Sequence, residues 1–260
     1  MTDWHRADRP RRRIGRGIEG HATIGSTNDR ARALLDEPGG EGRAVATDEQ
    51  TAGRGRRGRS WVSPAGRNLM MSVAVRPRLA ARDGWQLGMA AALAARAACA
   101  TRASVGLKWP NDVVAADGAK LGGLLLETTV DGERISSAVI GIGINVNWPR
   151  AEMPAEIAAG ATSLAELAGA PIDRVELLAD LLDALDGEVV AIEAGSSPLD
   201  RYRQACVTIG TRVGAETGEG RVEGLATTID EHGALVVETD EGTRVLSSGE
   251  ITRLRAAAPA

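Results

Sequence analysis

The strongest constraint on the fold is a series of short apolar segments between residues 106 and 148, separated by Asp-Gly pairs. Asp117-Gly118 and Asp131-Gly132 each lie between runs rich in Val, Ile and Leu. Asp-Gly favours a two-residue hairpin turn, because that turn needs positive φ at both central residues. The pattern therefore predicts a meander of antiparallel strands, and it argues against the strand–helix–strand alternation of a doubly wound parallel sheet.

The composition predicts a globular protein with an aliphatic core. Of the 260 residues, 43% are hydrophobic but only 2% are aromatic, and there is no Phe. Leu, Val, Ile and Ala must therefore fill the interior, where each fully buried aliphatic side chain contributes about 1.5–3 kcal/mol. A net charge of -4 with 25% charged residues argues against wholesale disorder and against a chain-wide basic field for nucleic acid.

The cysteines and histidines give no sign of a disulfide framework or of a metal site. Cys99 and Cys206 are far apart, and His5, His21 and His232 are scattered without metal-ligand spacing. A reducing cytoplasm is the expected compartment. No apolar run reaches transmembrane length, and the Arg-rich start of the chain is followed by no apolar stretch, so we expect neither a membrane span nor a secretory signal.

The chain is expected to divide into three segments. Residues 1–19 are rich in arginine and predict a disordered basic arm. Residues 20–207 contain most of the strands and two long helix-forming segments, one of which Asp173 opens as N-cap. Residues 208–260 contain short strands separated by glycine, which predict a small barrel. The expected fold class is α+β, with a mixed, mostly antiparallel sheet, flanking helices and this C-terminal module.

A Gly- and Arg-rich loop without apolar periodicity covers residues 50–67. The clustered guanidinium groups of Arg54, Arg56, Arg57 and Arg59 predict a phosphate-binding device, because guanidinium binds anions bidentately and glycine lets the backbone approach a ligand. The loop also satisfies the Gly-x-Gly-x-x-Gly dinucleotide fingerprint, but no helix-forming sequence follows it, which argues against that fold. A solvated basic loop is the alternative.

Only two of the 31 basic residues are lysines, Lys108 and Lys120. A compact ammonium on a flexible stem is not interchangeable with a guanidinium, so we interpret both lysines as chemically required. Chance retention on a solvated surface is the alternative. Trp61 follows the arginine cluster and Trp109 follows Lys108. An indole beside phosphate-binding groups suits base stacking, with core packing as the alternative.

A set of motifs in fixed order resembles the catalytic domain of the biotin–protein ligase family. They are STN at 26–28, QTAGRGRRGRSW at 50–61, SPAGRNLMMSVAVRP at 63–77, KWPNDVV at 108–114, KLGGLLLE at 120–127 and GIGINVN at 141–147. The resemblance implies a catalytic domain like that of class II aminoacyl-tRNA synthetases and an SH3-like C-terminal barrel. It indicates the monofunctional type, since the residues before position 20 are too few for the DNA-binding winged helix of bifunctional members.

The resemblance also implies a two-step reaction. Biotin and ATP, with Mg²⁺ carried by the triphosphate and no metal site in the protein, give biotinyl-5′-adenylate and pyrophosphate. The biotinyl group then passes to one lysine of the biotin carboxyl carrier domain of a biotin-dependent carboxylase. No specific DNA binding and no membrane partner are expected, and a homodimer is compatible with the resemblance.

Individual roles follow from the same match. Lys120 corresponds to the lysine that reaches the biotin carboxylate and the α-phosphate, Arg56 to a catalytic loop arginine, and Asp112 to a position associated with the acceptor lysine. The implied biotin-binding residues are Ser26, Thr27, Asn28, Gln50, Gly53, Arg54, Gly55, Arg56, Lys120, Gly123, Leu125 and Gly141. The implied ATP- and adenylate-binding residues are Arg56, Arg57, Arg59, Trp61, Lys108, Asn111, Lys120 and Asn145.

Several of these residues also have a purely structural interpretation. Ser26 and Thr27 suit a helix cap, a role compatible with ligand binding. Asn111 and Asp112 alone suit a turn, and Asn145 suits the end of a strand.

Two other functions compete with biotin ligation. A lipoate or octanoate ligase has a similar fold and also uses one lysine, but the arginine–glycine loop argues against it. A non-enzymatic RNA-binding protein would use the basic arm, the loop and the small barrel, but the negative net charge argues against it.

Overall fold

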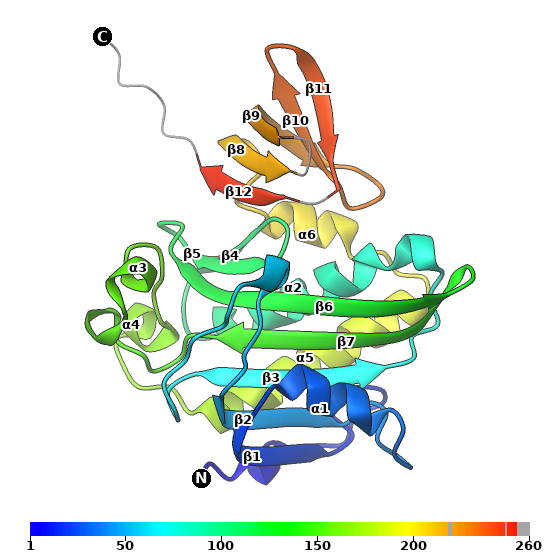
Figure 1. Ribbon diagram of the computed structural model, residues 1–260, viewed down its shortest axis with the longest axis vertical. Helices are drawn as coiled ribbons and strands as arrows, with labels where there is room; N and C mark the ends of the chain where they lie inside the picture. Colours follow the sequence, from blue (N-terminus) through cyan, green and yellow to red (C-terminus); the bar gives the residue numbers. More distant parts are fainter. Residues whose placement is uncertain (218–219, 248, 254–260) are drawn as a thin grey trace.

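The computed structural model describes residues 1–217, 220–247 and 249–253, which form two sheets. The strands of the first sheet are β1 (Ile18–Ile24), β2 (Ala44–Gln50), β3 (Leu69–Val75), β4 (Val105–Lys108), β5 (Asp112–Ala115), β6 (Lys120–Asp131) and β7 (Arg134–Ile144). Their order across the sheet is β1-β2-β3-β7-β6-β5-β4. Figure 1 shows the second sheet at one end of the molecule, beyond β4 and β5.

The meander predicted from the Asp-Gly pairs is present. Strands β4 to β7 pair antiparallel, and both turn glycines have positive φ, 87° at Gly118 and 56° at Gly132. The exception to antiparallel pairing is β1 with β2, which run parallel because helix α1 (Thr27–Leu34) connects them. The first sheet is therefore mixed and mostly antiparallel, as the sequence predicts.

Helices cover both faces of this sheet (Figure 1). The Ala-rich α2 (Trp85–Ala100) packs against α5 (Arg174–Glu193) and against the sheet, whereas α1 packs on β2, β3 and β7 from the other side. The carboxylate of Asp173 caps α5 by accepting the backbone N–H of Val175 at 2.8 Å. The core is aliphatic apart from a few buried Trp and Tyr side chains, so packing alone supplies most of its stability. Three short helices complete this part: α3 (Ala155–Ala158), α4 (Leu164–Ala168) and α6 (Leu199–Ala205).

The N-terminal segment is folded, which differs from the disordered arm predicted for residues 1–19. Trp4 and Ile14 are buried in the main core. The Asp186 carboxylate on α5 accepts the backbone N–H groups of Arg12, Arg13 and Ile14 at 3.0, 2.6 and 2.7 Å. Several acidic partners of this segment, Asp183, Asp186 and Glu193, lie more than 160 residues away on α5. A local view of the basic run does not detect them.

The C-terminal module is a small antiparallel sheet with the order β11-β10-β9-β8-β12. Its strands are β8 (Arg212–Thr217), β9 (Gly220–Ile229), β10 (Leu235–Thr239), β11 (Gly242–Leu246) and β12 (Glu250–Arg253). It is joined to the larger sheet by a hydrogen bond in which Trp109 Nε1 donates to the Gly233 carbonyl at 3.1 Å. Trp109 is thus a buried packing residue. The last seven residues of the predicted module, 254–260, lie outside the described part of the chain.

None of the helices in the described ranges is long and apolar enough to cross a membrane.

Candidate functional site

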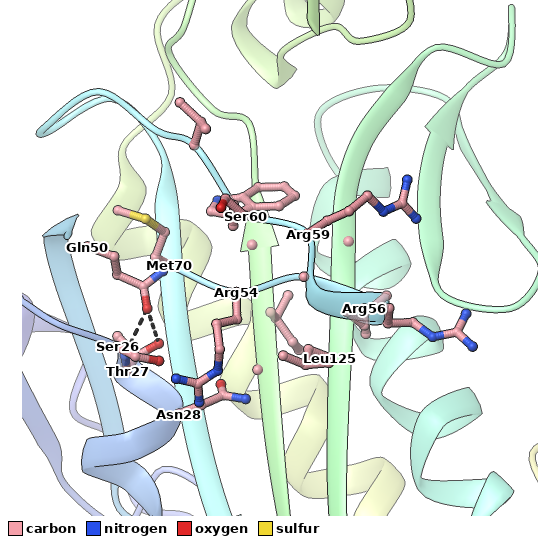
Figure 2. Close-up of a pocket in the computed structure, with 18 of the residues that line it drawn as sticks. Ser26, Thr27, Asn28, Gln50, Arg54, Arg56, Arg59, Ser60, Met70 and Leu125 are labelled. Atoms are coloured by element: carbon pink, nitrogen blue, oxygen red, sulfur yellow. Dashed lines mark hydrogen bonds between the residues drawn. The ribbon is translucent and has the colours of Figure 1, made fainter. Parts of the chain in front are cut away.

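A pocket of about 220 Å³ lies where β3, β6 and β7 meet the start of α1 and the arginine–glycine loop. Figure 2 shows residues that line it. The predicted site residues that line this pocket are Ser26, Thr27, Asn28, Gln50, Arg54, Gly55, Arg56, Arg59, Trp61, Asn111, Lys120, Gly123, Leu125, Gly141 and Asn145. The predicted residues outside the described lining are Gly53, Arg57, Lys108 and Asp112. Residues far apart in the sequence therefore converge on one cavity.

One end of the pocket carries neutral hydrogen-bonding groups. The Thr27 backbone N–H donates to Gln50 Oε1 at 2.8 Å, and Thr27 Oγ1 lies 3.0 Å from the same oxygen (Figure 2). Ser26 occupies the N-cap position of α1, but its side chain makes no capping hydrogen bond. The structure therefore positions Ser26 at the helix start without using its hydroxyl as a cap.

The glycines of β6 and β7 make room for side chains that cross the pocket floor. A Cβ on Gly141 would stand 2.2 Å from Asn28 Oδ1, and a Cβ on Gly143 would stand 2.6 Å from the Trp61 indole. A Cβ on Gly123 would stand 3.2 Å from Lys120 Nζ. Any larger residue at the first two positions would displace the side chain that covers it.

Lys120 and Asp112 form an ion pair beside this floor. Lys120 Nζ lies 2.7 Å from Asp112 Oδ1. This oxygen is buried, and the contact does not have the angle of a hydrogen bond, so no hydrogen-bond partner satisfies it within the described residues. Lys120 Nζ also lies 6.0 Å from the centre of the Trp61 ring. Although Asp112 is outside the lining, it touches the lysine that lines it.

A buried phenol lies close to the same ion pair. Burial raises the pKa of Tyr202 well above its ordinary value, the nearby Cys206 and Asp112 side chains add to the increase, and the positive charge of Arg56 opposes it. Tyr202 therefore stays a neutral hydroxyl beside the site at physiological pH.

The loop arginines bind different partners rather than one shared anion. Arg54 makes a bidentate pair with Asp29 of α1, with distances of 2.8 and 2.6 Å, and this pair lowers the pKa of the Asp29 carboxyl. Arg56 donates to Asn111 Oδ1 at 3.0 Å, and Arg57 donates to the Glu216 carbonyl of the C-terminal module at 3.2 Å. Figure 2 shows Arg54 directed toward the start of α1, and Arg56 and Arg59 directed away from it.

Two further residues were predicted to bind the nucleotide, Asn145 and Lys108. Asn145 is buried and lines the pocket; its Oδ1 accepts from Asn68 Nδ2 at 3.4 Å, and its Nδ2 donates to the Thr162 carbonyl at 3.1 Å. These bonds are compatible with the strand-end role, and its nucleotide-binding role stays a prediction. Lys108 ends β4 and lies outside the described lining.

Sequence reasoning missed several residues that line the pocket. They are Ser60, Val62, Met70, Met71, Ser72, Leu124, Ile142, Gly143, Trp148, Ile157 and Ala161. Ser72 had a detectable signal, because it is a polar residue in the otherwise apolar run LMMSVAV, all of which is buried. No comparable sequence signal marks Trp148, Ile157 and Ala161. They form an apolar wall of the pocket only because their segment folds over the ends of the strands.

The arrangement suits a ligand with a neutral polar head and an anionic end. Uncharged donors and acceptors lie at the α1 end of the pocket, where Arg54 is paired with Asp29, and Lys120 and Arg56 stand nearer the other end. Within the described ranges, no group of three or more His, Cys, Asp and Glu side chains could hold a metal ion.

Comparisons with known proteins agree with this chemistry. The model of the biotin/lipoate A/B protein ligase family matches residues 22–145, and that of the biotin protein ligase C-terminal domain matches residues 208–253. The chain is 34% identical to the bifunctional ligase/repressor BirA of Bacillus subtilis, over 92% of this chain and 74% of that protein. It is 36% identical to the biotin–[acetyl-CoA-carboxylase] ligase of Mycobacterium tuberculosis, over 90% of this chain and 88% of that protein.

A solved structure extends the likeness to three dimensions. The biotin protein ligase from Aquifex aeolicus in complex with biotin and ATP has a TM-score of 0.75 and 30% identity, covering 92% of this chain and 99% of that one. The fold and the pocket define a ligase with an SH3-like C-terminal module. The chain belongs to the biotin protein ligase family, which confirms the resemblance seen in its motifs.

Proposed function

We propose that this protein is an ATP-dependent biotin–protein ligase that activates biotin as biotinyl-5′-adenylate and transfers it to a lysine of a biotin carboxyl carrier domain. The observation that carries the proposal is the polarity of this pocket: neutral groups at the α1 end, where Arg54 is paired with Asp29, and Lys120 with Arg56 nearer the other end. Biotin has the same polarity, because it carries an uncharged cyclic urea at one end and a carboxylate at the other. The ligase in complex with biotin and ATP, which shares the fold, supports this assignment.

In the first step, a carboxylate oxygen of biotin attacks the α-phosphorus of ATP, and the bond from that phosphorus to the pyrophosphate oxygen breaks. The reactants are both anionic, so the protein must bring them together and offset their repulsion. Lys120 supplies a compact charge beside the glycine floor, and Arg56, tied to Asn111, supplies a second. Magnesium is expected to arrive with the triphosphate.

In the second step, the amine of the acceptor lysine attacks the acyl carbon of the adenylate, and AMP leaves with the electron pair of the broken bond. The amine must first lose a proton, and Asp112 is the carboxylate proposed to accept it. Its contact with Lys120 places this group beside the lysine of the first step. The same ion pair thus connects the two steps.

Mass spectrometry of a carrier-domain fragment provides the direct test. The fragment is incubated with the protein, ATP, Mg²⁺ and biotin, and in parallel with lipoate or octanoate in place of biotin. We expect a mass increase of one biotinyl group on a single lysine, in the biotin reaction only. No increase with biotin, or an equal one with lipoate, contradicts the proposal. Lys120→Ala serves as the inactive control.

A further inference from the structure

Asp112 carries a carboxylate oxygen whose capacity to accept a hydrogen bond is unused. The residue begins β5, and its side chain is only 20% exposed. Its Oδ1 is buried and has no hydrogen-bond partner among the described residues, although Lys120 Nζ lies 2.7 Å away. A buried acceptor that receives no hydrogen bond raises the free energy of the folded protein. A donor that approaches this oxygen at a better angle would therefore bind favourably.

The ammonium of Lys120 rests on a glycine and is free to move toward the pocket. A Cβ on Gly123 would stand 3.2 Å from Lys120 Nζ and 3.3 Å from its Cε, so the glycine leaves the space in which the end of the lysine lies. The centre of the Trp61 ring is 6.0 Å from the same Nζ. Lys120 lines the pocket and is 37% exposed. Its flexible stem therefore lets the ammonium turn from Asp112 to an anion in the pocket.

Asp112 cannot follow the lysine, because its backbone is fixed between two strands. Its register partners are Lys108 on β4 and Gly123 on β6. The Lys120–Asp112 pair is neutral as a whole, so an anion that attracts Lys120 leaves the Asp112 charge without this partner. A largely buried charge that loses its partner is unfavourable. Binding of an anion beside Lys120 therefore creates a demand for another cation at Asp112.

The acceptor of the proposed second step supplies a cation of the same kind. A lysine side chain is an ammonium at neutral pH, and it offers three N–H donors. The backbone of Lys120 is fixed at the start of β6, which limits the angle at which its ammonium meets Asp112. An ammonium on another protein does not have this restriction. It can donate directly to the unused Oδ1.

We propose that Asp112 exchanges partners between the two steps of the reaction: Lys120 balances its charge first, and the ammonium of the acceptor lysine balances it afterwards. The inference rests on the proposed function, in which the anionic adenylate attracts Lys120. Formation of the adenylate then strengthens the binding of the acceptor. By thermodynamic linkage, the acceptor strengthens the binding of the adenylate by the same factor.

The test measures the Kd of a carrier-domain fragment by calorimetry, with and without a stable analogue of the adenylate. In the analogue a CH₂ group replaces the acyl carbonyl, so the phosphate charge is kept but no transfer occurs. We expect the analogue to lower the Kd about tenfold. Two matched probes isolate the charges. One is a fragment with methionine in place of the target lysine, and the other is an analogue with an uncharged triazole ring in place of the phosphate. Neither probe should show the gain.

Variants of the ion pair separate partner exchange from a general attraction between charges. Lys120→Met keeps the apolar stem but removes the ammonium, so without any analogue it should bind the fragment about tenfold more tightly than the wild type does. Asp112→Asn should remove the gain caused by the analogue, and in the double variant it should abolish the effect of Lys120→Met. A general attraction would leave both gains in place. Arg82→Met, at an exposed arginine outside the described lining, is the control and should bind as the wild type does.

The outcomes distinguish this inference from the proposed function. No pyrophosphate release from biotin and ATP by the wild type overturns the proposed function. If the wild type is active but the analogue does not tighten binding of the lysine-bearing fragment, partner exchange is wrong. It is also wrong if the methionine fragment gains equally, or if the gain persists in Asp112→Asn. If Lys120→Met does not fold, Asp112→Asn and the two matched probes decide the question in the same assay.

Discussion

The two ends of the pocket are built in different ways. At the α1 end, Thr27, Asn28 and Ser72 are buried on regular elements, and each bonds to its neighbour in the sheet or helix. The arginines, in contrast, stand on a loop, and the described contacts of Arg54, Arg56 and Arg57 are with α1, with Asn111 and with the C-terminal module. The α1 end is thus held by hydrogen bonds within regular elements, whereas the positions of the loop arginines depend on contacts with separate elements.

This contrast follows from the physical task at each end. A neutral hydrogen-bonding group must be held rigidly, since a small error in direction leaves a buried donor or acceptor unsatisfied. Several cations held close together repel one another, and the pairing of Arg54 with Asp29 offsets part of this repulsion. Variants at the two ends should therefore fail in different ways.

Lys120→Ala should have the largest effect. Removing its ammonium eliminates the charge nearest the glycine floor, and we expect adenylate formation to fall about 10²–10³-fold. The measurement is the pyrophosphate burst with biotin and ATP. Arg82→Ala is the control, because the guanidinium of Arg82 is exposed and lies outside the described lining, and its burst should equal that of the wild type. A normal burst in Lys120→Ala would remove Lys120 from the first step.

Asp112→Asn should separate the two steps. The variant keeps the shape of the side chain but cannot accept a proton, so transfer to the carrier should slow about 10²-fold while adenylation continues. Single-turnover transfer from preformed adenylate measures one rate, and pyrophosphate release measures the other. Equal losses in both rates indicate that Asp112 acts through its ion pair with Lys120 rather than on the acceptor.

Arg56→Gly should weaken the hold on the intermediate. Arg56 ties the loop to Asn111 of the KWPND motif, so its loss should let the adenylate escape about tenfold faster. Rapid gel filtration after a burst, followed by detection of free biotinyl-adenylate, measures the release. Arg67→Gly is a control at an exposed arginine outside the described lining. If the adenylate stays bound in Arg56→Gly, the loop end of the pocket is as rigid as the α1 end.

The sequence predicts most of the sheet, since its signals are local. The Asp-Gly pairs specify hairpins, and alternating burial along β9 and β10 follows from their apolar spacing. The motifs also bring together most of the predicted pocket residues, although their separate roles remain predictions. The prediction that these residues share one pocket depends on the family resemblance, because their spacing in the sequence does not indicate that residues 26–28 and 141 are in contact.

What the sequence does not predict depends on contacts between distant segments. The folded N-terminus needs Asp186, and the orientation of the Asn28 amide needs Glu127. The divergence of the arginines needs Asp29 and Glu216, which lie on separate elements. Three of these partners are ordinary carboxylate side chains and the fourth is the backbone carbonyl of Glu216. The sequence does not mark any of them as a partner, because only the packing of the elements brings them together.

Glu19→Gln gives the smallest expected effect and tests the rigid end, where β1 meets α1. Two hydrogen bonds from Arg30, at 2.6 and 2.8 Å, lower the pKa of Glu19 from 4.5 to about 2. A lowered carboxyl pKa stabilises the folded state above pH 4.5, and this contribution is lost as the pH falls toward 2. We expect the variant to lose about 1 kcal/mol of unfolding free energy at pH 7, a modest amount because the pair is partly exposed.

Denaturant unfolding should show that the difference in unfolding free energy between wild type and variant narrows below pH 4.5. Glu37→Gln, at the more exposed partner of Arg30, should change stability less. A constant gap across this range would mean that the variant acts through packing and not through the charge of Glu19.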